Sequence, residues 1–156
     1  MLSCDKCGKS DLIPTGSDGL KKWSCTDYEW QYQRRRSSHA NYAKCYLHNY
    51  VGKYSIHLHN HCWHTRGGIK YTAKTEKDKK YTLVFYAYAN HATGWRGVLI
   101  EVCVNDKNCV KTRVDSYVWT PVYYDFTATG QSEIKIKSGR QHCASVSEIT
   151  LTECFE

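Results

Sequence analysis

The stretch Tyr54-Ser-Ile-His-Leu-His-Asn-His-Cys-Trp-His64 alternates apolar and polar residues with a period of two. Its apolar residues occupy every second position as far as Leu58, and histidines occupy the positions between, from His57 to His61. Successive side chains of a β-strand point to opposite faces, and a helix does not give this period. The stretch therefore predicts a strand with one face in a core. Its other face carries imidazoles, which either bind a partner or form an unusually polar exposed surface.

The same alternation recurs later in the chain, in residues 81–89, 98–104 and 132–137 and around Ile149 and Leu151. Clusters of Gly, Asn, Asp and Thr separate these segments, and no segment keeps a helical period. Many short strands at this spacing predict an all-β fold, either an antiparallel sandwich or a barrel. The first 50 residues are harder to assign, but we expect a short strand at Leu12-Ile13. Trp23 and Trp119 are expected in the core.

The chain has 156 residues and nine cysteines. This length predicts one domain, over residues 1–156, with a single substantial core. So many cysteines indicate an oxidising compartment and a fold stabilised by disulfides, and hence a secreted protein. Their odd number leaves at least one as a free thiol or for a bond between chains. Zinc is the competing explanation, but Cys4-Asp-Lys-Cys7 has no second Cys-x-x-Cys to complete a zinc knuckle. Cys103 and Cys109 flank a turn-rich tetrapeptide, so we expect a bridge between them across a hairpin.

The formal net charge of +7 favours anionic partners such as acidic glycans, nucleic acid or a membrane surface. The lysines are scattered, and the basic run Arg34-Arg35-Arg36 is either a solvated loop or an anion-binding patch. No nucleic-acid-binding motif accompanies the charge, so nucleic acid is not expected as a partner. No apolar stretch is long enough to span a bilayer, so membrane insertion is not expected. Residues 1–4 lack the hydrophobic region of a signal peptide, and we expect the sequence to be a trimmed form of a secreted protein.

Several short motifs carry a resemblance to a known family. In chain order they are Asp11-Leu-Ile-Pro-Thr-Gly16 with Gly19-Leu-Lys-Lys-Trp23, Tyr54-Ser-Ile-His-Leu58 with Trp63-His-Thr-Arg-Gly-Gly68, Tyr81-Thr-Leu-Val-Phe-Tyr-Ala87, Trp119-Thr-Pro121 with Asp125-Phe-Thr127, and Val146-Ser-Glu-Ile-Thr-Leu151. In this order they resemble carbohydrate-binding modules of the galactose-binding-domain-like superfamily, nearest to the xylan- and glucan-binding modules of families 4, 9 and 22. The likeness runs from about residue 11 to 152. It implies an antiparallel β-sandwich of the jelly-roll type that binds a glycan.

Sugar recognition needs a flat aromatic ring against the apolar face of a pyranose, with planar polar groups nearby for its hydroxyls. Trp63 and Trp95 lie in polar, glycine-flanked segments, and Tyr86 and Tyr88 share the strand face opposite the predicted core. The alternative is that the tyrosines only cover a second apolar surface. The candidate carbohydrate-binding residues are Trp63, Arg66, Tyr86, Tyr88, Trp95, Arg96, His57 and His59.

Two kinds of metal site are candidates. The resemblance implies a structural calcium as cofactor. Here Asp18 and Glu148 stand nearest to the family's ligand positions, although the family's acidic residues are partly replaced and disulfides could do the stabilising instead. A transition metal is the second candidate, with His59, His61 and His64 as ligands. Alternate residues of a strand lie about 6.5–7 Å apart. Three of them cannot close on one zinc ion, but two neighbours, or one of them with His64, could do so with a ligand from another strand. Otherwise the histidines hydrogen-bond glycan hydroxyls or nothing.

Catalysis is not expected. The sequence contains no Gly-x-Ser-x-Gly and no His-Glu-x-x-His motif. A glycosidase would need two carboxylates across a cleft, and no such pair can be identified. The leading hypothesis is a secreted, non-catalytic glycan-binding module or lectin, whose ligand is a polysaccharide or, given the charge, an acidic glycan. One alternative is an adhesive extracellular-matrix protein that self-associates through metals or cysteines. Another is a secreted protein that binds a protein partner through the same loops.

Overall fold

The computed structural model of the protein describes residues 6–7, 12–13, 22–25, 45–50, 53–58, 68–91, 98–114, 118–138 and 143–155. In these ranges the chain forms eleven β-strands and no helix. The strands are β1 (Lys6–Cys7), β2 (Ser24–Cys25), β3 (Cys45–Tyr50), β4 (Lys53–Leu58), β5 (Gly68–Ala73), β6 (Lys80–His91), β7 (Val98–Val104), β8 (Lys107–Val114), β9 (Thr120–Thr127), β10 (Ser132–Ser138) and β11 (Cys143–Phe155). Nothing in this part of the chain has the helical length and apolar character needed to span a bilayer.

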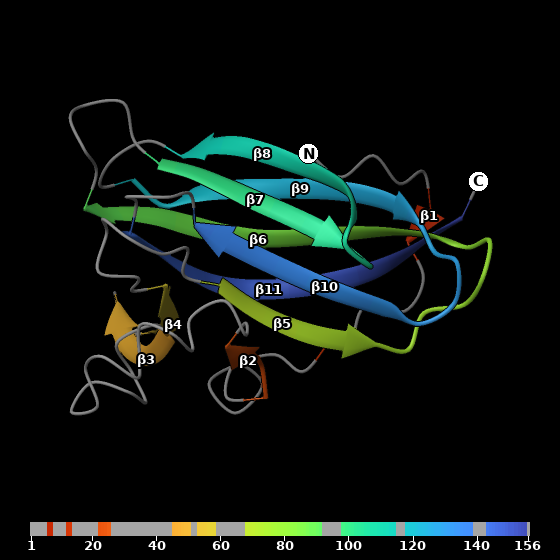
Figure 1. Ribbon diagram of the computed structural model, residues 1–156, viewed down its shortest axis with the longest axis horizontal. Coiled ribbons are helices and arrows are strands. Elements are labelled where there is room, and N and C mark those ends of the chain that lie inside the picture. The colour runs from red at the N-terminus through yellow and green to blue at the C-terminus, as the bar shows by residue number, and fades with distance from the viewer. Residues whose placement is uncertain are drawn as a thin grey trace.

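The strands form two antiparallel sheets. The first sheet has the order β3-β4-β11-β6-β9, with β1 paired to β11, and the second sheet has the order β2-β5-β10-β7-β8. Figure 1 shows β5, β10 and β7 of the second sheet lying across β11 and β6 of the first. Consecutive strands alternate between the sheets from β4 to β7 and again from β8 to β11, as in a jelly roll. The predicted antiparallel β-sandwich is confirmed.

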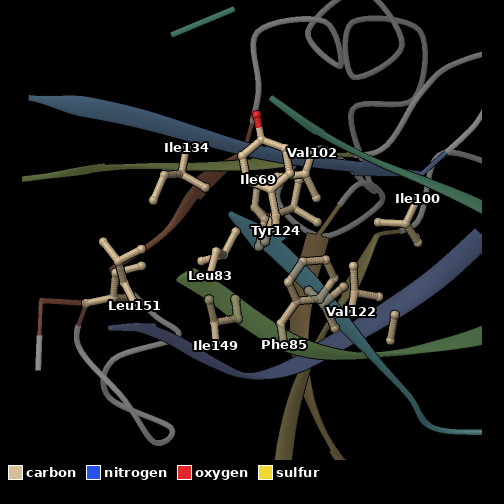
Figure 2. Close-up of a cluster of buried hydrophobic side chains, with 14 of the residues drawn as sticks. Ile69, Leu83, Phe85, Ile100, Val102, Val122, Tyr124, Ile134, Ile149 and Leu151 are labelled. Carbon is tan, nitrogen blue, oxygen red and sulfur yellow. The ribbon is translucent and has the colours of Figure 1, made fainter. Parts of the chain in front are cut away.

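Side chains from both sheets fill the space between them. Figure 2 shows Leu83, Phe85 and Val122 of the first sheet in one cluster with Ile100 and Ile134 of the second. Each of these side chains is at most 2% exposed. Fully burying an apolar side chain of this kind stabilises the fold by about 1.5–3 kcal/mol relative to leaving it exposed. The core therefore fixes which face of each sheet looks inward.

The alternation predicted from the sequence is confirmed in the long strands. In β6 the odd-numbered residues from Tyr81 to Ala89 are all buried in the core, and Tyr86 and Tyr88 lie on the other face. The same holds for Ile134 in β10, which is fully buried between two half-buried charged residues. Because side chains alternate along a strand, this pattern also fixes the residues of the outer faces.

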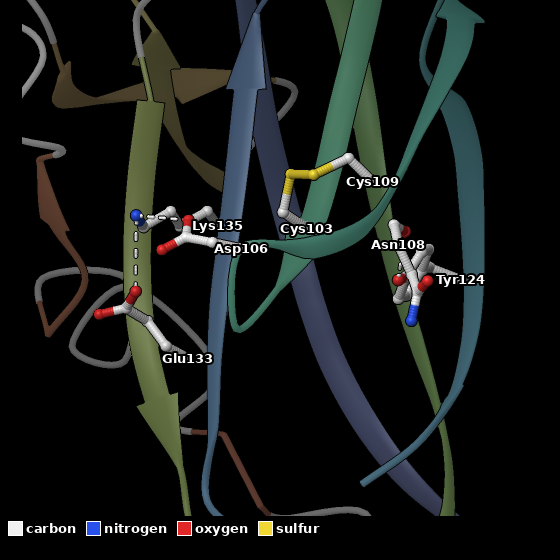
Figure 3. Close-up of a disulfide and its surroundings, with 7 residues drawn as sticks. All are labelled: Cys103, Asp106, Asn108, Cys109, Tyr124, Glu133 and Lys135. Carbon is white, nitrogen blue, oxygen red and sulfur yellow. Dashed lines mark hydrogen bonds and ion pairs between the residues drawn. A yellow bond between two sulfur atoms is a disulfide. The ribbon is translucent and has the colours of Figure 1, made fainter. Parts of the chain in front are cut away.

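The expected disulfide is present: Cys103 of β7 is bonded to Cys109 of β8 (Figure 3). The two strands are joined by a two-residue turn at Asn105 and Asp106, whose φ angles are 54° and 57°. Positive φ at both central residues is the hallmark of a type I′ hairpin turn, for which Asn and Asp are favoured. The Asn-Asp pair therefore sets the hairpin that brings the two cysteines together.

Two expectations for the first part of the chain have different outcomes. Trp23 is a core residue as expected, since it is 7% exposed and its ring centroid lies 5.5 Å from that of Tyr71. The strand expected at Leu12-Ile13 is wrong, because both residues form a bend. Ile13 nevertheless reaches the core at 1% exposure. The next residue is Pro14, which lacks the N–H that a strand ladder requires.

Candidate functional site

Aromatic side chains gather on the outer face of the first sheet, over the neighbouring strands β6 and β9. Tyr86 of β6 and Tyr123 of β9 are 40% and 41% exposed, and Tyr88 and Trp119 are half-buried beside them. We call Tyr86, Tyr88, Trp119 and Tyr123 the aromatic face. Tyr123 is the register partner of Val84, four residues from Tyr88 along β6. At about 3.3 Å per residue the aromatic face is about 13 Å long, which exceeds a single sugar ring.

Trp119 and Tyr88 form the end of the aromatic face. Their ring centroids are 5.1 Å apart and their planes are tilted by 33°, a favourable geometry for an aromatic pair. The expectation that Trp119 belongs to the core is therefore wrong. Val122 and Tyr124 point into the core, and so the odd-numbered residues of this segment face outward. This parity is visible in the sequence once residues 120–127 are recognised as a strand.

Strand β4, which contains the first residues of the histidine-rich stretch, belongs to the same sheet. His57 of β4 is the register partner of Ser145 in β11, and Ser145 is in turn the partner of Tyr88 in β6. His57 thus occupies the same row of the sheet as Tyr88, with β11 between their two strands. Ser145 and its outer-face neighbour Ser147 are each only 1% exposed. The accessible part of the aromatic face therefore lies over β6 and β9 rather than over β11.

Within the described part of the chain, one carboxylate on β6 and β9 accompanies the exposed rings. Asp125 of β9 lies two residues after Tyr123 on the same face and is exposed. Thr82 of β6, its register partner, donates a hydrogen bond from Oγ1 to Asp125 Oδ1 over 2.6 Å. This hydrogen bond orients the carboxylate beside Tyr123. A carboxylate next to an aromatic ring is a suitable acceptor for the hydroxyl groups of a sugar that lies on the ring.

The outer face of the second sheet has a different character. Its outward positions carry mostly charged side chains, here called the charged face: Lys70, Glu101, Asp106, Lys111, Arg113, Glu133, Lys135 and Lys137. Lys135 Nζ lies 2.8 Å from Asp106 Oδ1 and 3.5 Å from Glu133 Oε1 (Figure 3). The hydrogen bond from Lys135 lowers the pKa of Asp106 and raises the pKa of the lysine. Charge is thus concentrated on the sheet that lacks the exposed rings.

Most of the residues singled out from the sequence lie outside the described residues: Asp18, Arg34-Arg35-Arg36, His59, His61, Trp63, His64, Arg66, Trp95 and Arg96. Glu148 is exposed and has a φ of 54°, at the irregularity in β11 between Ser147 and Thr150. It offers one carboxylate, whereas calcium takes six or more oxygen ligands. The described residues therefore do not make a calcium site by themselves. Calcium and a histidine-bound metal both stay predictions.

No protein-family model and no curated protein matches the sequence. Solved structures do match the fold. A family 61 carbohydrate-binding module in complex with β-1,4-galactotriose is 13% identical with a TM-score of 0.57, over 92% of this chain and 98% of its own. A family 35 carbohydrate-binding module from Clostridium thermocellum is 15% identical with a TM-score of 0.55, over 92% and 98%. The family 22 xylan-binding domain of Paenibacillus barcinonensis Xyn10C is 11% identical with a TM-score of 0.53, over 100% and 99%. At these identities the likeness is one of fold, and the resemblance to such modules predicted from the motifs is confirmed at that level: this chain has the β-sandwich fold of carbohydrate-binding modules.

Proposed function

We propose that this protein is a non-catalytic carbohydrate-binding module that holds a glycan against its aromatic face. The observation that carries the proposal is the exposure of Tyr86 and Tyr123 beside the Tyr88–Trp119 pair, on an outer sheet face. The sandwich fold that presents this face resembles that of solved carbohydrate-binding modules. Aromatic rings grouped on an outer sheet face commonly mark a binding surface. A pyranose presents C–H groups on one face, and these pack against such rings.

Hydrogen bonding would supply the orientation that stacking alone does not. The hydroxyl groups of Tyr86 and Tyr123 and the carboxylate of Asp125 stand on the same outer face. Asp125 is already fixed by Thr82, so it is poised to accept from a sugar hydroxyl without further ordering. Glycoside hydrolysis requires two carboxyl groups flanking the scissile bond. Among the described residues of β6 and β9, Asp125 is the one carboxylate beside the exposed rings, and a carboxylate held by a threonine hydroxyl suits binding rather than this chemistry.

The charges favour an uncharged ligand on this face. On β6 and β9 the outward positions carry one cation, Lys80, at one end, and one anion, Asp125, nearer the exposed rings. With one charge of each sign, these positions give an acidic glycan lying on Tyr86 and Tyr123 no net attraction. We therefore propose a neutral polysaccharide in place of the acidic glycan that the net charge alone suggests. The positive charge of the chain would then not be what recognises the sugar.

Titration calorimetry against soluble polysaccharides tests this proposal. Neutral xylan, mixed-linkage β-glucan and β-1,4-galactan would be compared with anionic polygalacturonate and heparin. Trp119→Ala and Tyr86→Ala are expected to weaken binding of the neutral ligand at least tenfold, about 1.4 kcal/mol. Phe155→Ala is the matched control. Phe155 is an aromatic residue that is 46% exposed, and it lies at the C-terminal end of β11, outside the aromatic face. Unchanged affinity in both aromatic-face variants, or no binding of any neutral polymer at millimolar sugar, would sink the proposal.

Two parts of the hypothesis need separate experiments. Trp63→Ala and Trp95→Ala test whether these two tryptophans contribute to the same ligand, since both lie outside the described residues. Secretion is proposed from the nine cysteines, and the Cys103–Cys109 bond supports it because disulfides persist in oxidising compartments. Recovery of the native protein from the culture medium with this bond intact is the expected result. Accumulation inside the cell with both cysteines reduced would contradict it.

A further inference from the structure

Three potential metal ligands lie close together around the disulfide: Glu101 of the charged face and the two cysteines themselves. A carboxylate oxygen of Glu101 and the Sγ atoms of Cys103 and Cys109 all lie within 4.8 Å of one another. Glu101 and Cys103 are two residues apart on β7 and therefore share its outer face, while Cys109 reaches them from β8. While the two sulfurs are bonded to each other they are not thiolates and cannot bind a metal ion in this way.

We propose that reduction of the Cys103–Cys109 bond creates a binding site for a zinc-type divalent ion, with Glu101 as third ligand. Two molecules of a small thiol such as glutathione would reduce the bond. They supply two electrons and two protons, giving two cysteine thiols and one disulfide of the small thiol. On binding the ion, each cysteine thiol releases its proton to solvent. The cation would hold two thiolates and one carboxylate and keep one position for water, which suits zinc.

The hairpin is held in place by contacts that do not involve the sulfurs. Asn105 accepts a hydrogen bond at Oδ1 from the backbone N–H of Glu133 over 2.8 Å, and its side-chain amide donates to the Gln131 carbonyl over 3.2 Å. On the other side the Tyr124 hydroxyl donates to the Asn108 carbonyl over 2.8 Å. Figure 3 shows Tyr124 and Asn108 together on one side of the disulfide. The two sulfurs are therefore expected to stay close together after the bond between them is broken.

The spacing and the surrounding charge both suit such an ion. Ligand atoms on a tetrahedral zinc lie about 3.3–3.8 Å apart for bond lengths of 2.0–2.3 Å. The three atoms here, within 4.8 Å of one another, need only small side-chain rotations to reach that arrangement. Glu101 has Lys111 as its register partner on β8 and Lys137 on β10. These cations offset the excess negative charge that two thiolates and a carboxylate place around a divalent ion.

Cobalt binding to the reduced protein tests the proposal. The whole chain would be reduced with excess glutathione, desalted without oxygen and titrated with Co²⁺, because absorption bands from thiolate to cobalt report sulfur ligands directly. The oxidised protein serves as the first comparison. A Cys103→Ser/Cys109→Ser double variant, reduced in the same way, separates this site from the other seven cysteines. We expect the reduced wild type to bind one more ion than the double variant, and Zn²⁺ to displace it.

Glu101→Gln leaves both cysteines in place and tests the third ligand. It is expected to raise the dissociation constant for the extra ion at least tenfold. Glu133→Gln, a change of the same kind on the same face, is expected to leave it unchanged. Equal numbers of ions in the wild type and the double variant would overturn the proposal, as would equal effects of the two glutamate variants. Loss of native circular dichroism on reduction would also overturn it, because the site depends on an intact hairpin. A negative result leaves the glycan proposal standing, since that proposal concerns the first sheet.

Discussion

Replacing Tyr124 by phenylalanine removes one hydroxyl group at the point where β9 contacts the β7–β8 hairpin. The side chain of Tyr124 is 6% exposed, and its hydroxyl donates to the Asn108 carbonyl over 2.8 Å. A hydrogen bond of this kind contributes about 0.5–1.5 kcal/mol. Asn108 is exposed, so water can replace the lost donor, and we expect a loss of about 1 kcal/mol. For a chain of this length that loss lowers Tm by about 2–4 °C.

The same substitution has a pH signature. Burial raises the pKa of Tyr124 above its ordinary value of 10.0. As the pH rises above 10, the Tyr124 hydroxyl loses its proton in the unfolded chain before it does so in the folded chain. The stabilisation is therefore complete below pH 10 and is lost as the pH rises through the raised pKa. Tyr124→Phe cannot titrate there, so its stability should fall less steeply above pH 10 than that of the wild type.

Urea unfolding followed by fluorescence at about pH 8 and about pH 10.5 measures both effects. Tyr123→Phe is the control, because Tyr123 is the next residue along β9, its side chain is 41% exposed and it lies on the outer face. Its free energy of unfolding should change by less than about 0.5 kcal/mol. Equal losses in the two variants at the lower pH, or equal alkaline slopes for Tyr124→Phe and the wild type, would refute the reasoning.

Three further predictions concern charge, core and covalent structure. Lys135 lowers the pKa of Asp106, so this pair stabilises the fold above the ordinary carboxyl pKa and less so as the pH falls. In Asp106→Asn, Tm should therefore fall less steeply than in the wild type as the pH is lowered from about 5 to about 2, and an equal fall in both proteins would contradict this. Phe85→Ala should cost about 3–5 kcal/mol in urea unfolding, because its ring is fully buried, and a loss below about 1 kcal/mol would not fit that burial. Cys154 is disulfide-bonded and faces Cys7 in the β1–β11 register. Peptide mapping without reduction should recover these two joined, whereas a Cys154 peptide joined to any other cysteine would rule this pairing out.

The sequence predicted those strands whose two faces differ sharply. In residues 81–89 every second residue is apolar, and that face is the one that the core buries. The Cys103–Cys109 bond could also be predicted, because Asn and Asp between the cysteines specify a tight hairpin turn. Both signals are local. They depend on side-chain alternation and turn geometry, which neighbouring residues alone determine.

Strand β8 and the position of Trp119 could not be predicted in this way. Residues 107–113 are exposed or half-buried, so β8 shows little apolar alternation, and its place in the sheet depends on pairing with β7. Trp119 is expected in the core from the sequence, but its ring pairs with Tyr88 on the outer face. Its outward direction follows from the register between β6 and β9, which joins residues about 40 positions apart. A single stretch of sequence does not contain that pairing, so the sequence predicts Tyr88 as a site residue but not Trp119.

Where the charges lie bears more on the choice of ligand than their sum does. The net charge of +7 suggests an acidic partner. On the second sheet, however, the outward lysines and the arginine that the structure describes stand among three carboxylates, those of Glu101, Asp106 and Glu133. The ion pair from Lys135 to Asp106, with 2.8 Å between Nζ and Oδ1, is internal to the protein. The exposed rings stand on the other sheet, beside the carboxylate of Asp125. A polymer that stacks on Tyr86 and Tyr123 is separated from the charged face by the whole thickness of the sandwich, so affinity for it should depend only weakly on salt. Measuring the dissociation constant at about 0.05 M and about 0.5 M NaCl separates the two mechanisms, because a tenfold loss at the higher salt would mean that the lysines, and not the rings, hold the ligand.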